Sequence, residues 1–283
     1  MKATAAIRIG RRGALHLALA AFGVVMIYPI LWMFFGSFKP TAEIFSDTGL
    51  WPKTWFTENY RQGWSGLPRV DFGSFFANSF VVSLAVVVCN VASCSLVAYA
   101  FARMRFALQR LWFAVMLMTM MLPAQVTLIP QYLLFHKLGW TNTYLPLTVP
   151  HLFAISSFFV FLMIQFIRGL PRELDEAATI DGCSAFGVYW RIVMPLCAPA
   201  LITTGIFSFI WTWDDFFSQL IYINDIVKYT VPLGLRLFLD GTGGSQWGPM
   251  FAMSILSLIP SFLVFLFAQK YFVQGIATSG LKG

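Results

Sequence analysis

Charged side chains are scarce in this sequence. Asp, Glu, Lys and Arg together make up 11% of its 283 residues. A soluble domain carries roughly 25% charged residues, so this composition excludes an ordinary soluble fold. Hydrophobic residues make up 58% of the chain, and the mean hydropathy is +0.73. The shortage of charge therefore indicates an integral membrane protein.

Cysteine and histidine are also few, and their spacing excludes the usual metal and redox motifs. The four cysteines form no C-x-x-C pair, and the three histidines are scattered along the chain. The sequence has no GxxxxGK[ST] loop to cradle the phosphates of ATP, and no credible spacing of a nucleophile and a base. We therefore expect neither an enzyme nor a cofactor bound to this chain, and any driving energy must come from another polypeptide.

Long uncharged runs predict the membrane spans. A spanning helix needs about 20 predominantly apolar residues, whereas each strand of a membrane barrel needs about 10 alternating ones. Six uncharged runs are 22 to 31 residues long. We therefore predict an all-α integral membrane protein with a single transmembrane domain over residues 1–283. The six predicted helices cover about 13–38, 72–102, 111–135, 143–168, 195–222 and 247–270.

Basic residues predict the orientation of the chain. Segments that face the cytoplasm carry an excess of Lys and Arg. With the N-terminus inside, the inner segments hold 12 of the 19 basic residues, and the longer outer segments hold 7. We therefore expect both termini in the cytoplasm and external loops at 39–71 and 222–248.

Acidic residues are concentrated in one of the predicted cytoplasmic segments. Residues 172–196 read RELDEAATIDGCSAFGVYWRIVMPL, and four of the twelve acids lie within nine of them. Pro171 and the acids suit the first turn of a helix, and Gly182 permits a sharp reversal. We predict a helix, a turn and a second helix over 171–194, lying across the membrane surface. An acidic helix suits a basic cleft on a cytoplasmic protein better than an anionic lipid surface; the rival interpretation is a solvated acidic loop.

This segment resembles the signature loop of bacterial ABC importer permeases. That pattern is Glu-Ala-Ala, three residues, Gly, nine residues and then Ile-x-Leu-Pro. Met194 replaces the usual Leu, which is a near-isosteric change. The stretches AYAFARMRF, MLPAQVTLIP, FIWTWDDF and FVQGIATSGLKG are similar to the maltose-type, binding-protein-dependent carbohydrate permeases, so the resemblance covers nearly the whole chain. The matching loop residues are Glu176-Ala177-Ala178, Gly182, Ile192 and Pro195.

The resemblance implies the transmembrane subunit of an ATP-driven importer of sugars or oligosaccharides in the bacterial cytoplasmic (inner) membrane. It implies a second homologous permease, a dimer of ABC ATPases that hold ATP and Mg, an extracytoplasmic solute-binding protein and membrane lipid, but no nucleic acid. The tail residues Gly275 and Lys282 would also reach the ATPases. The coupling helix between helices 4 and 5, with its loop, would contact them through Glu173, Asp175, Glu176, Ala177, Ala178, Asp181, Gly182, Ile192 and Pro195.

Polar residues in or beside the apolar runs predict a substrate path. Trp213 beside Asp214 suits a sugar, because aromatic faces and hydrogen bonds to hydroxyl groups bind sugars. The family commonly has Asn where Asp214 stands. The rival interpretation is an interfacial Trp belt with acids at the outer water boundary, and a sugar site on the partner permease would leave these residues to gate the path. The predicted path residues are Asn78, Gln125, Gln131, Trp213, Asp214 and Asp215.

The outer loop 222–248 ends in a glycine-rich tip. The resemblance implies that this tip contacts the binding protein, whereas a flexible connector is the ordinary interpretation. The tip residues are Asp240, Gly241, Gly243 and Gly244.

Other transport classes and a membrane enzyme remain as alternatives. An ABC importer for glycerol phosphate, amino acids, phosphate or metals would share the acidic loop. A stand-alone secondary carrier would need intramembrane coupling charges and an internal repeat, and a membrane enzyme would need His, Asp or Cys clustered at one depth. A carrier or an enzyme should work alone, whereas a permease should copurify with an ATPase.

Overall fold

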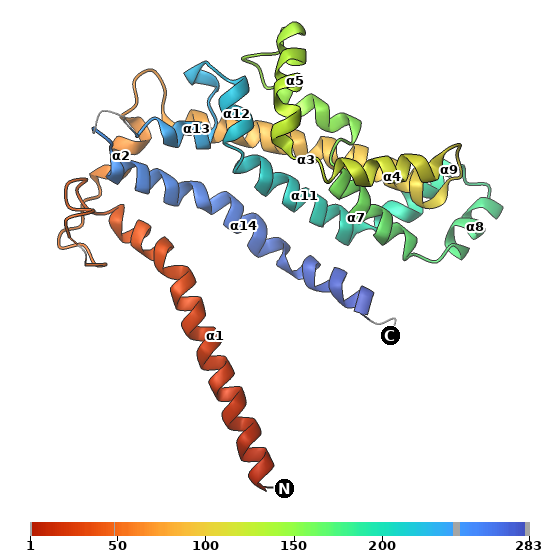
Figure 1. Cartoon of the computed structure of the whole chain (residues 1–283), viewed down its shortest axis with the longest axis horizontal. Coiled ribbons are helices and arrows are strands. Elements are labelled where there is room, and N and C mark those ends of the chain that lie inside the picture. Colours follow the sequence, from red (N-terminus) through yellow and green to blue (C-terminus); the bar gives the residue numbers. More distant parts are fainter. Residues whose placement is uncertain (1, 48, 240–243, 281–283) are drawn as a thin grey trace. The chain divides into compact units, whose positions relative to one another are not determined.

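The computed structural model describes residues 2–47, 49–239 and 244–280, without the side chains of 2–12, 124 and 270–280. All regular elements in this part of the chain are helical, which confirms the predicted all-α class (Figure 1). The chain forms two compact units. One comprises Met1–Phe72 with Leu235–Ser257, and the other comprises Gly73–Gly234 with Leu258–Gly283.

The first unit contains α1 (Lys2–Gly36), α2 (Glu58–Ser65) and the beginning of α14 (Trp247–Gly280). The short helix α2 lies in the predicted external loop 39–71. The side chain of Asn59 holds it in place, because its Nδ2 donates to the carbonyl oxygens of Ser37 and Lys39, each at 2.8 Å.

The second unit is built on α3 (Phe72–Arg103) and α11 (Ala198–Trp213), with shorter helices between and after them. Its other elements are α4 (Gln109–Thr119), α5 (Ala124–Lys137), α6 (Leu145–Thr148), η1 (Val149–Phe153), α7 (Ser157–Arg168), α8 (Glu173–Ile180), α9 (Ala185–Val188), η2 (Tyr189–Val193), α10 (Met194–Leu196), α12 (Phe217–Tyr222), η3 (Ile226–Lys228), the larger part of α13 (Val231–Arg236) and the remainder of α14.

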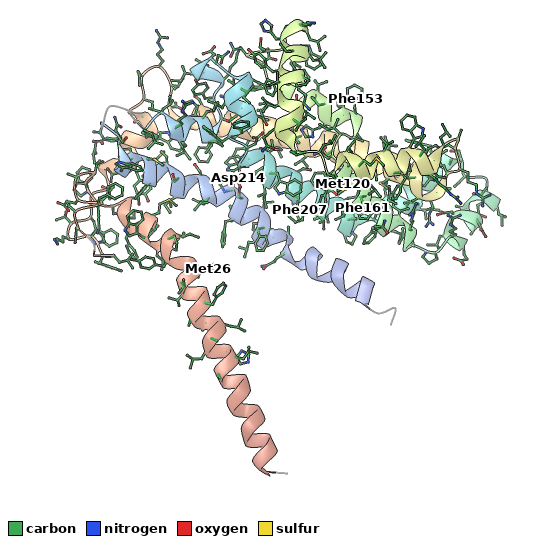
Figure 2. The ribbon with its side chains drawn as sticks, viewed as in Figure 1. Met26, Met120, Phe153, Phe161, Phe207 and Asp214 are labelled. Carbon is green, nitrogen blue, oxygen red and sulfur yellow. The ribbon has the colours of Figure 1, made fainter. Side chains whose placement is uncertain are left out.

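Among the described residues, four stretches are long and apolar enough to cross a membrane: Gly13–Gly36, Phe72–Arg103, Leu145–Arg168 and Trp247–Gln269. A fifth is formed by Ala185–Leu196 with Ala198–Trp213 if this pair, bent by 77°, is one span. Apolar side chains extend from the ribbons (Figure 2), and Met26 and Phe153 are 56% and 76% exposed. Such surfaces are expected of a chain that lies in lipid or against other membrane subunits.

The stretch predicted as one helix over 111–135 is divided in two. Helix α4 has 11 residues and α5 has 14, and the chain between them turns at Met120–Pro123. Pro123 has no N–H and disfavours helical geometry in the residue before it, which explains why α4 does not continue. Each piece is shorter than the roughly 20 residues of a full span.

The predicted helix over 195–222 is also interrupted. Helix α11 ends at Trp213, and α12 begins at Phe217. Between them, the carboxylate of Asp215 accepts a hydrogen bond from the backbone N–H of Ser218 at 3.1 Å. Short acidic side chains often accept hydrogen bonds from nearby backbone N–H groups, and such bonds favour the start of a new helix after a break.

The core of the second unit lies where α3 packs against α7. Small residues recur every fourth position on α3, at Cys94, Ala98 and Ala102, and all three are buried. Small side chains let helix backbones approach closely within a membrane. Larger side chains of α7, including Phe159 and Met163, fill the space opposite them. This packing makes the α3–α7 pair a firm base for the loop that follows α7.

Candidate functional site

The acidic loop has the predicted helix–turn–helix form. Helix α8 is followed by Gly182, whose φ of +85° lies in the left-handed region that glycine tolerates best. The N–H of Cys183 then donates to the carbonyl oxygen of Ala178 at 2.9 Å. Ser184 caps the next helix, since its Oγ accepts from the N–H of Gly187 at 3.2 Å. Local hydrogen bonds and one glycine are therefore enough to reverse the chain.

One face of α8 is anchored to α3. Nε of Arg103 lies 2.8 Å from Oδ2 of Asp175, and the Arg103 side chain is only 6% exposed. The Nε–H is not aligned with the carboxylate, so this is an ion pair in contact rather than a directed hydrogen bond. A terminal nitrogen of Arg103 also donates to the carbonyl oxygen of Leu170 at 2.9 Å, and Ala178 is buried beside this contact. Asp175 and Ala178 therefore fix which way α8 faces.

The opposite face of α8 is open. Residues 173, 176, 177 and 180 follow the helical spacing of one face, and all four side chains are exposed. Two of them, Glu173 and Glu176, are carboxylates, and Ile180 is 86% exposed. A carboxylate-bearing surface with a central alanine and an exposed isoleucine is suited to a partner that is basic and partly apolar.

The second half of the loop is held by two tyrosine hydroxyls. The hydroxyl of Tyr99 donates to the carbonyl oxygen of Ala185 at 3.0 Å, and the hydroxyls of Tyr189 and Ser95 lie 2.8 Å apart. Together with Arg103, these groups place polar contacts at every fourth residue of α3. This row was not predicted from the sequence, although polar residues at a spacing of four inside an apolar helix are a readable signal.

The other predicted coupling residues lie around these anchors. Asp181 and Pro195 are exposed, and Ile192 is partly buried against the core. The backbone of Gly275 lies in α14, whereas Lys282 is outside the described residues. The structure therefore gathers the acidic-loop residues into one region of the second unit.

The predicted substrate-path residues do not form one site. Nδ2 of Asn78 donates to the carbonyl oxygens of Val227 and Tyr229, each at 2.8 Å, so this amide joins α3 to the segment after η3. Trp213 is 2% exposed and stacks on Phe209, with ring centroids 5.4 Å apart. Its faces are therefore covered by other side chains of this chain.

The remaining path residues are more open. Gln125, Gln131 and Asp214 are exposed, and the carboxylate of Asp215 accepts the hydrogen bond from the Ser218 N–H described above. Asp214, labelled in Figure 2, directly follows the last residue of α11. Of the glycine-rich tip, Gly244 precedes α14, whereas Asp240, Gly241 and Gly243 lie outside the described residues.

A buried polar network joins α3, η1 and α11. Nδ1 of His151 lies 3.0 Å from Oδ1 of Asn90, and Nδ2 of Asn90 donates to Oγ of Ser208 at 3.0 Å. Oγ of Ser93 donates to the carbonyl oxygen of His151 at 2.7 Å. Asn90 and Ser208 were not among the predicted residues. A side-chain amide inside an uncharged helix nevertheless indicates a hydrogen bond to another part of the protein. Each polar group in this network satisfies another, so the network holds three helices together.

Residues 94–278 match the family model described as the inner membrane component of binding-protein-dependent transport systems. The chain belongs to this family. It is therefore a transport subunit of the ABC permease type and not an enzyme. The matched range contains α8 and the whole acidic loop.

Two relatives resemble nearly the full chain. It is 32% identical to the trehalose/maltose transport system permease protein MalG of Thermococcus litoralis over 92% of this chain and 93% of the relative. It is 30% identical to the diacetylchitobiose uptake system permease protein DasC of Streptomyces coelicolor over 91% and 92%. Solved structures include a chain of a bacterial ABC transporter involved in import of the acidic polysaccharide alginate. That chain has a TM-score of 0.80 and 22% identity over 92% of this chain and 95% of its own length, so the two share the fold.

Proposed function

We propose that this permease forms one half of the pore of a sugar or oligosaccharide importer in the bacterial inner membrane. The names of the relatives support this substrate class, since they refer to trehalose or maltose, diacetylchitobiose and arabinooligosaccharides. A second homologous permease completes the pore, and a solute-binding protein delivers the sugar. A related bacterial alginate transporter has been crystallised in complex with a periplasmic protein that carries an alginate pentasaccharide.

The two-faced helix α8 is the observation that carries the proposed mechanism. Its inner face is tied to α3 by Arg103 and Asp175, and its outer face presents Glu173, Glu176 and Ile180. We propose that this outer face enters a cleft on an ATPase subunit, where Glu176 meets a basic side chain. ATP and Mg are held by the ATPases. Closure of the ATPase pair then moves α8, and the ion pair passes the movement to the spanning helix α3.

We propose six spans with both termini in the cytoplasm. The four candidate stretches and the bent pair supply five, and α4 with α5 supply the sixth as a broken span. Broken helices are common in transporters where the chain borders a water-filled path rather than lipid. The basic residues at the ends of α3 and α7 support the cytoplasmic placement of the acidic loop.

Among the predicted path residues, we propose Gln125, Gln131 and Asp214 for contact with the solute. These three side chains are exposed, and each can hydrogen-bond to a sugar hydroxyl. Asn78 and Trp213 have structural contacts within the chain, and we propose that they support the path without touching the sugar. The tip around Gly244 is proposed to meet the binding protein.

The test is to replace Glu176 by Ala in the complete transporter, reconstituted in proteoliposomes with its binding protein. We expect binding of the ATPase subunits to weaken about 10- to 100-fold, because a hydrogen bond to a charged group contributes roughly 1.5–3 kcal/mol. Sugar uptake should fall with it while the permease stays in the membrane.

Glu43→Ala is the matched control, because it removes a carboxylate from the loop after α1 and leaves α8 unchanged. Binding-protein affinity for a panel of sugars identifies the solute. Normal ATPase binding and uptake in the Glu176→Ala transporter would show that α8 does not couple, and a binding protein that captures no sugar would contradict the substrate class.

A further inference from the structure

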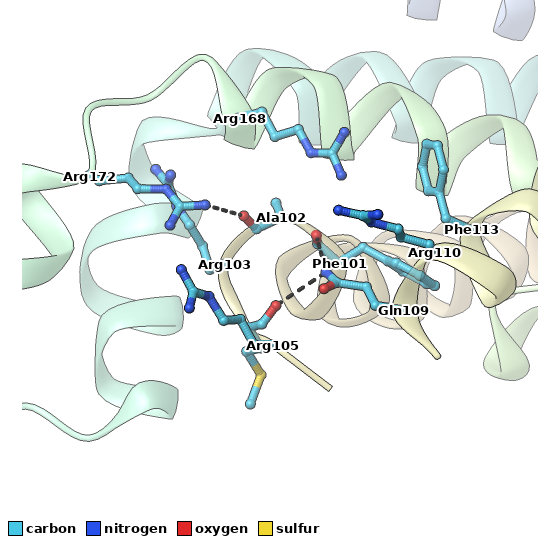
Figure 3. A pocket seen from close by; sticks show the side chains of 10 residues that line it. Phe101, Ala102, Arg103, Arg105, Gln109, Arg110, Phe113, Arg168 and Arg172 are labelled. Carbon is cyan, nitrogen blue, oxygen red and sulfur yellow. Dashed lines mark hydrogen bonds between the residues drawn. The ribbon is translucent and has the colours of Figure 1, made fainter. Parts of the chain in front are cut away.

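Five arginines line one cavity of about 410 Å³ in the second unit (Figure 3). They come from three places: the end of α3 with the turn after it, the start of α4, and the end of α7 with the residue before α8. Phe101, Phe113 and Gln109 are among the other lining residues. The arginines are Arg103, Arg105, Arg110, Arg168 and Arg172.

Two of the arginines are used by the fold. Arg103 pairs with Asp175, and a terminal nitrogen of Arg172 donates to the carbonyl oxygen of Ala102 at 3.4 Å. For the other three, no carboxylate among the described residues lies within 4.0 Å, and the guanidinium carbon of Arg168 lies 5.3 Å from the centre of the Phe113 ring. Arginines 105, 110 and 168 thus bring three uncompensated positive charges to one cavity, which favours an anion with several acceptor oxygens.

The cavity lies at the ends of two stretches that are long and apolar enough to cross a membrane. The spans Phe72–Arg103 and Leu145–Arg168 end at two of its arginines. Arginines at the ends of membrane-spanning helices extend towards the headgroup layer, so a cavity at these two ends is within reach of lipid headgroups. Phosphate is the anion that this layer supplies.

Exposed apolar side chains adjoin the cavity. Leu108, Leu111 and Trp112 at the start of α4 are 65%, 54% and 54% exposed, and α4 has no buried residue within this chain. Met104 and Phe106, in the turn before α4, are exposed as well. A ligand with both an anionic phosphate and an apolar tail matches the cavity and this apolar surface together.

From this combination we infer that the five-arginine cavity binds the phosphate of an anionic phospholipid. The acyl chains lie along the exposed side of α4, and the phosphate oxygens accept hydrogen bonds from Arg105, Arg110 and Arg168. Arg103 and Arg172 line this cavity and also the neighbouring hollow formed with Asp175, Glu176 and Thr179. The lipid therefore lies beside the first turn of α8 and stabilises Arg103 and Arg172, the two arginines shared by the cavity and the hollow.

The test uses the assembled transporter, delipidated in detergent and titrated with phosphatidylglycerol or phosphatidylcholine under native mass spectrometry. The variant carries Arg105→Gln, Arg110→Gln and Arg168→Gln. We expect phosphatidylglycerol affinity to fall about fivefold per charge and about 100-fold in the triple variant, with phosphatidylcholine unaffected. Where the triple variant fails to assemble, the three single variants give the fivefold steps.

A matched control removes three exposed charges elsewhere, as Arg69→Gln, Lys137→Gln and Arg236→Gln, and should bind phosphatidylglycerol like the parent. Equal losses in the two triple variants would mean that only overall charge matters, and this would overturn the site. Displacement of the lipid by soluble glycerol phosphate at equal concentration would assign the cavity to a free phosphate. Loss of ATPase subunits with unchanged lipid binding would assign it to a protein partner.

Discussion

Lys39 shows how one buried charge can organise the segment that follows a membrane span. Its side chain is 3% exposed, and its Nζ donates to the carbonyl oxygens of Asp47 and Gly49. The Asp47 carboxylate lies 3.7 Å from this Nζ and 3.6 Å from Nζ of Lys53. A buried ammonium without such partners would be strongly unfavourable, so these contacts are what allow Lys39 to lie inside the loop.

The pKa of Asp47 makes the stability of this loop dependent on pH. A hydrogen bond from the Gly49 N–H lowers this pKa below 3.8, and the charges of Lys39 and Lys53 lower it further. Because the folded pKa is below the unfolded one, ionised Asp47 stabilises the loop above pH 3.8, and this contribution is lost as the pH falls through the folded value. Asp47→Asn should therefore speed amide exchange in residues 39–56 at pH 6.

The control for Asp47 is Glu43→Gln, which removes one negative charge from the same loop. It should leave amide exchange at pH 6 unchanged. The parent and the Asp47→Asn variant should converge below the folded pKa, because the parent carboxyl is then protonated. A difference that stayed constant down to pH 2 would show that the charge of Asp47 is not what holds the loop.

At the scale of elements, the acids of α8 have different surroundings. Asp175 contacts Arg103, whereas Glu173, two residues earlier, is exposed. The composition of the loop predicts that acids gather here, and it predicts the glycine turn. It does not distinguish the acid that anchors the helix from those that are exposed, because Arg103 is 72 positions away in the sequence.

Asp175→Ala should loosen α8 from α3. The substitution leaves Arg103 largely buried without its counter-ion, a change that costs about 3–5 kcal/mol in a fully buried pair and less here, where Asp175 is part-exposed. Faster amide exchange is expected across Glu173–Ile180 in the permease pair stripped of its ATPase subunits, where Glu173 has no partner to lose. Glu173→Ala on the same helix should leave the exchange unchanged, and equal exchange in both variants would refute the anchoring role.

The helix boundaries show which features of the fold a single sequence determines. The uncharged runs predict the continuous spans well, because lipid demands long apolar helices. Prolines are harder to interpret, since Pro123 marks the end of a break while Pro130 lies inside α5. Tertiary neighbours decide whether the freed carbonyl group is satisfied, and a single sequence does not contain that information.

For the whole molecule, the orientation of the spans can be tested directly. In a Cys183→Ser background, Thr54→Cys places a thiol in the proposed outer loop and Arg191→Cys places one in the proposed inner loop; both positions are exposed. A membrane-impermeant maleimide should label Thr54→Cys on intact cells, and Arg191→Cys only after permeabilisation. Labelling of Arg191→Cys on intact cells would invert the topology and remove the ATPases from reach of α8.

The gap between α4 and α5 has a thermodynamic consequence for assembly. Every helix end leaves amide and carbonyl groups without a partner four residues away, and the turn at Met120–Pro123 satisfies only some of them. In pure hydrocarbon each remaining group would cost several kcal/mol. An isolated copy drifting in the bilayer would carry this penalty, whereas a neighbouring subunit enclosing a column of water would relieve it. In the proposed two-permease pore, hydration of the lumen would therefore favour association of the subunits.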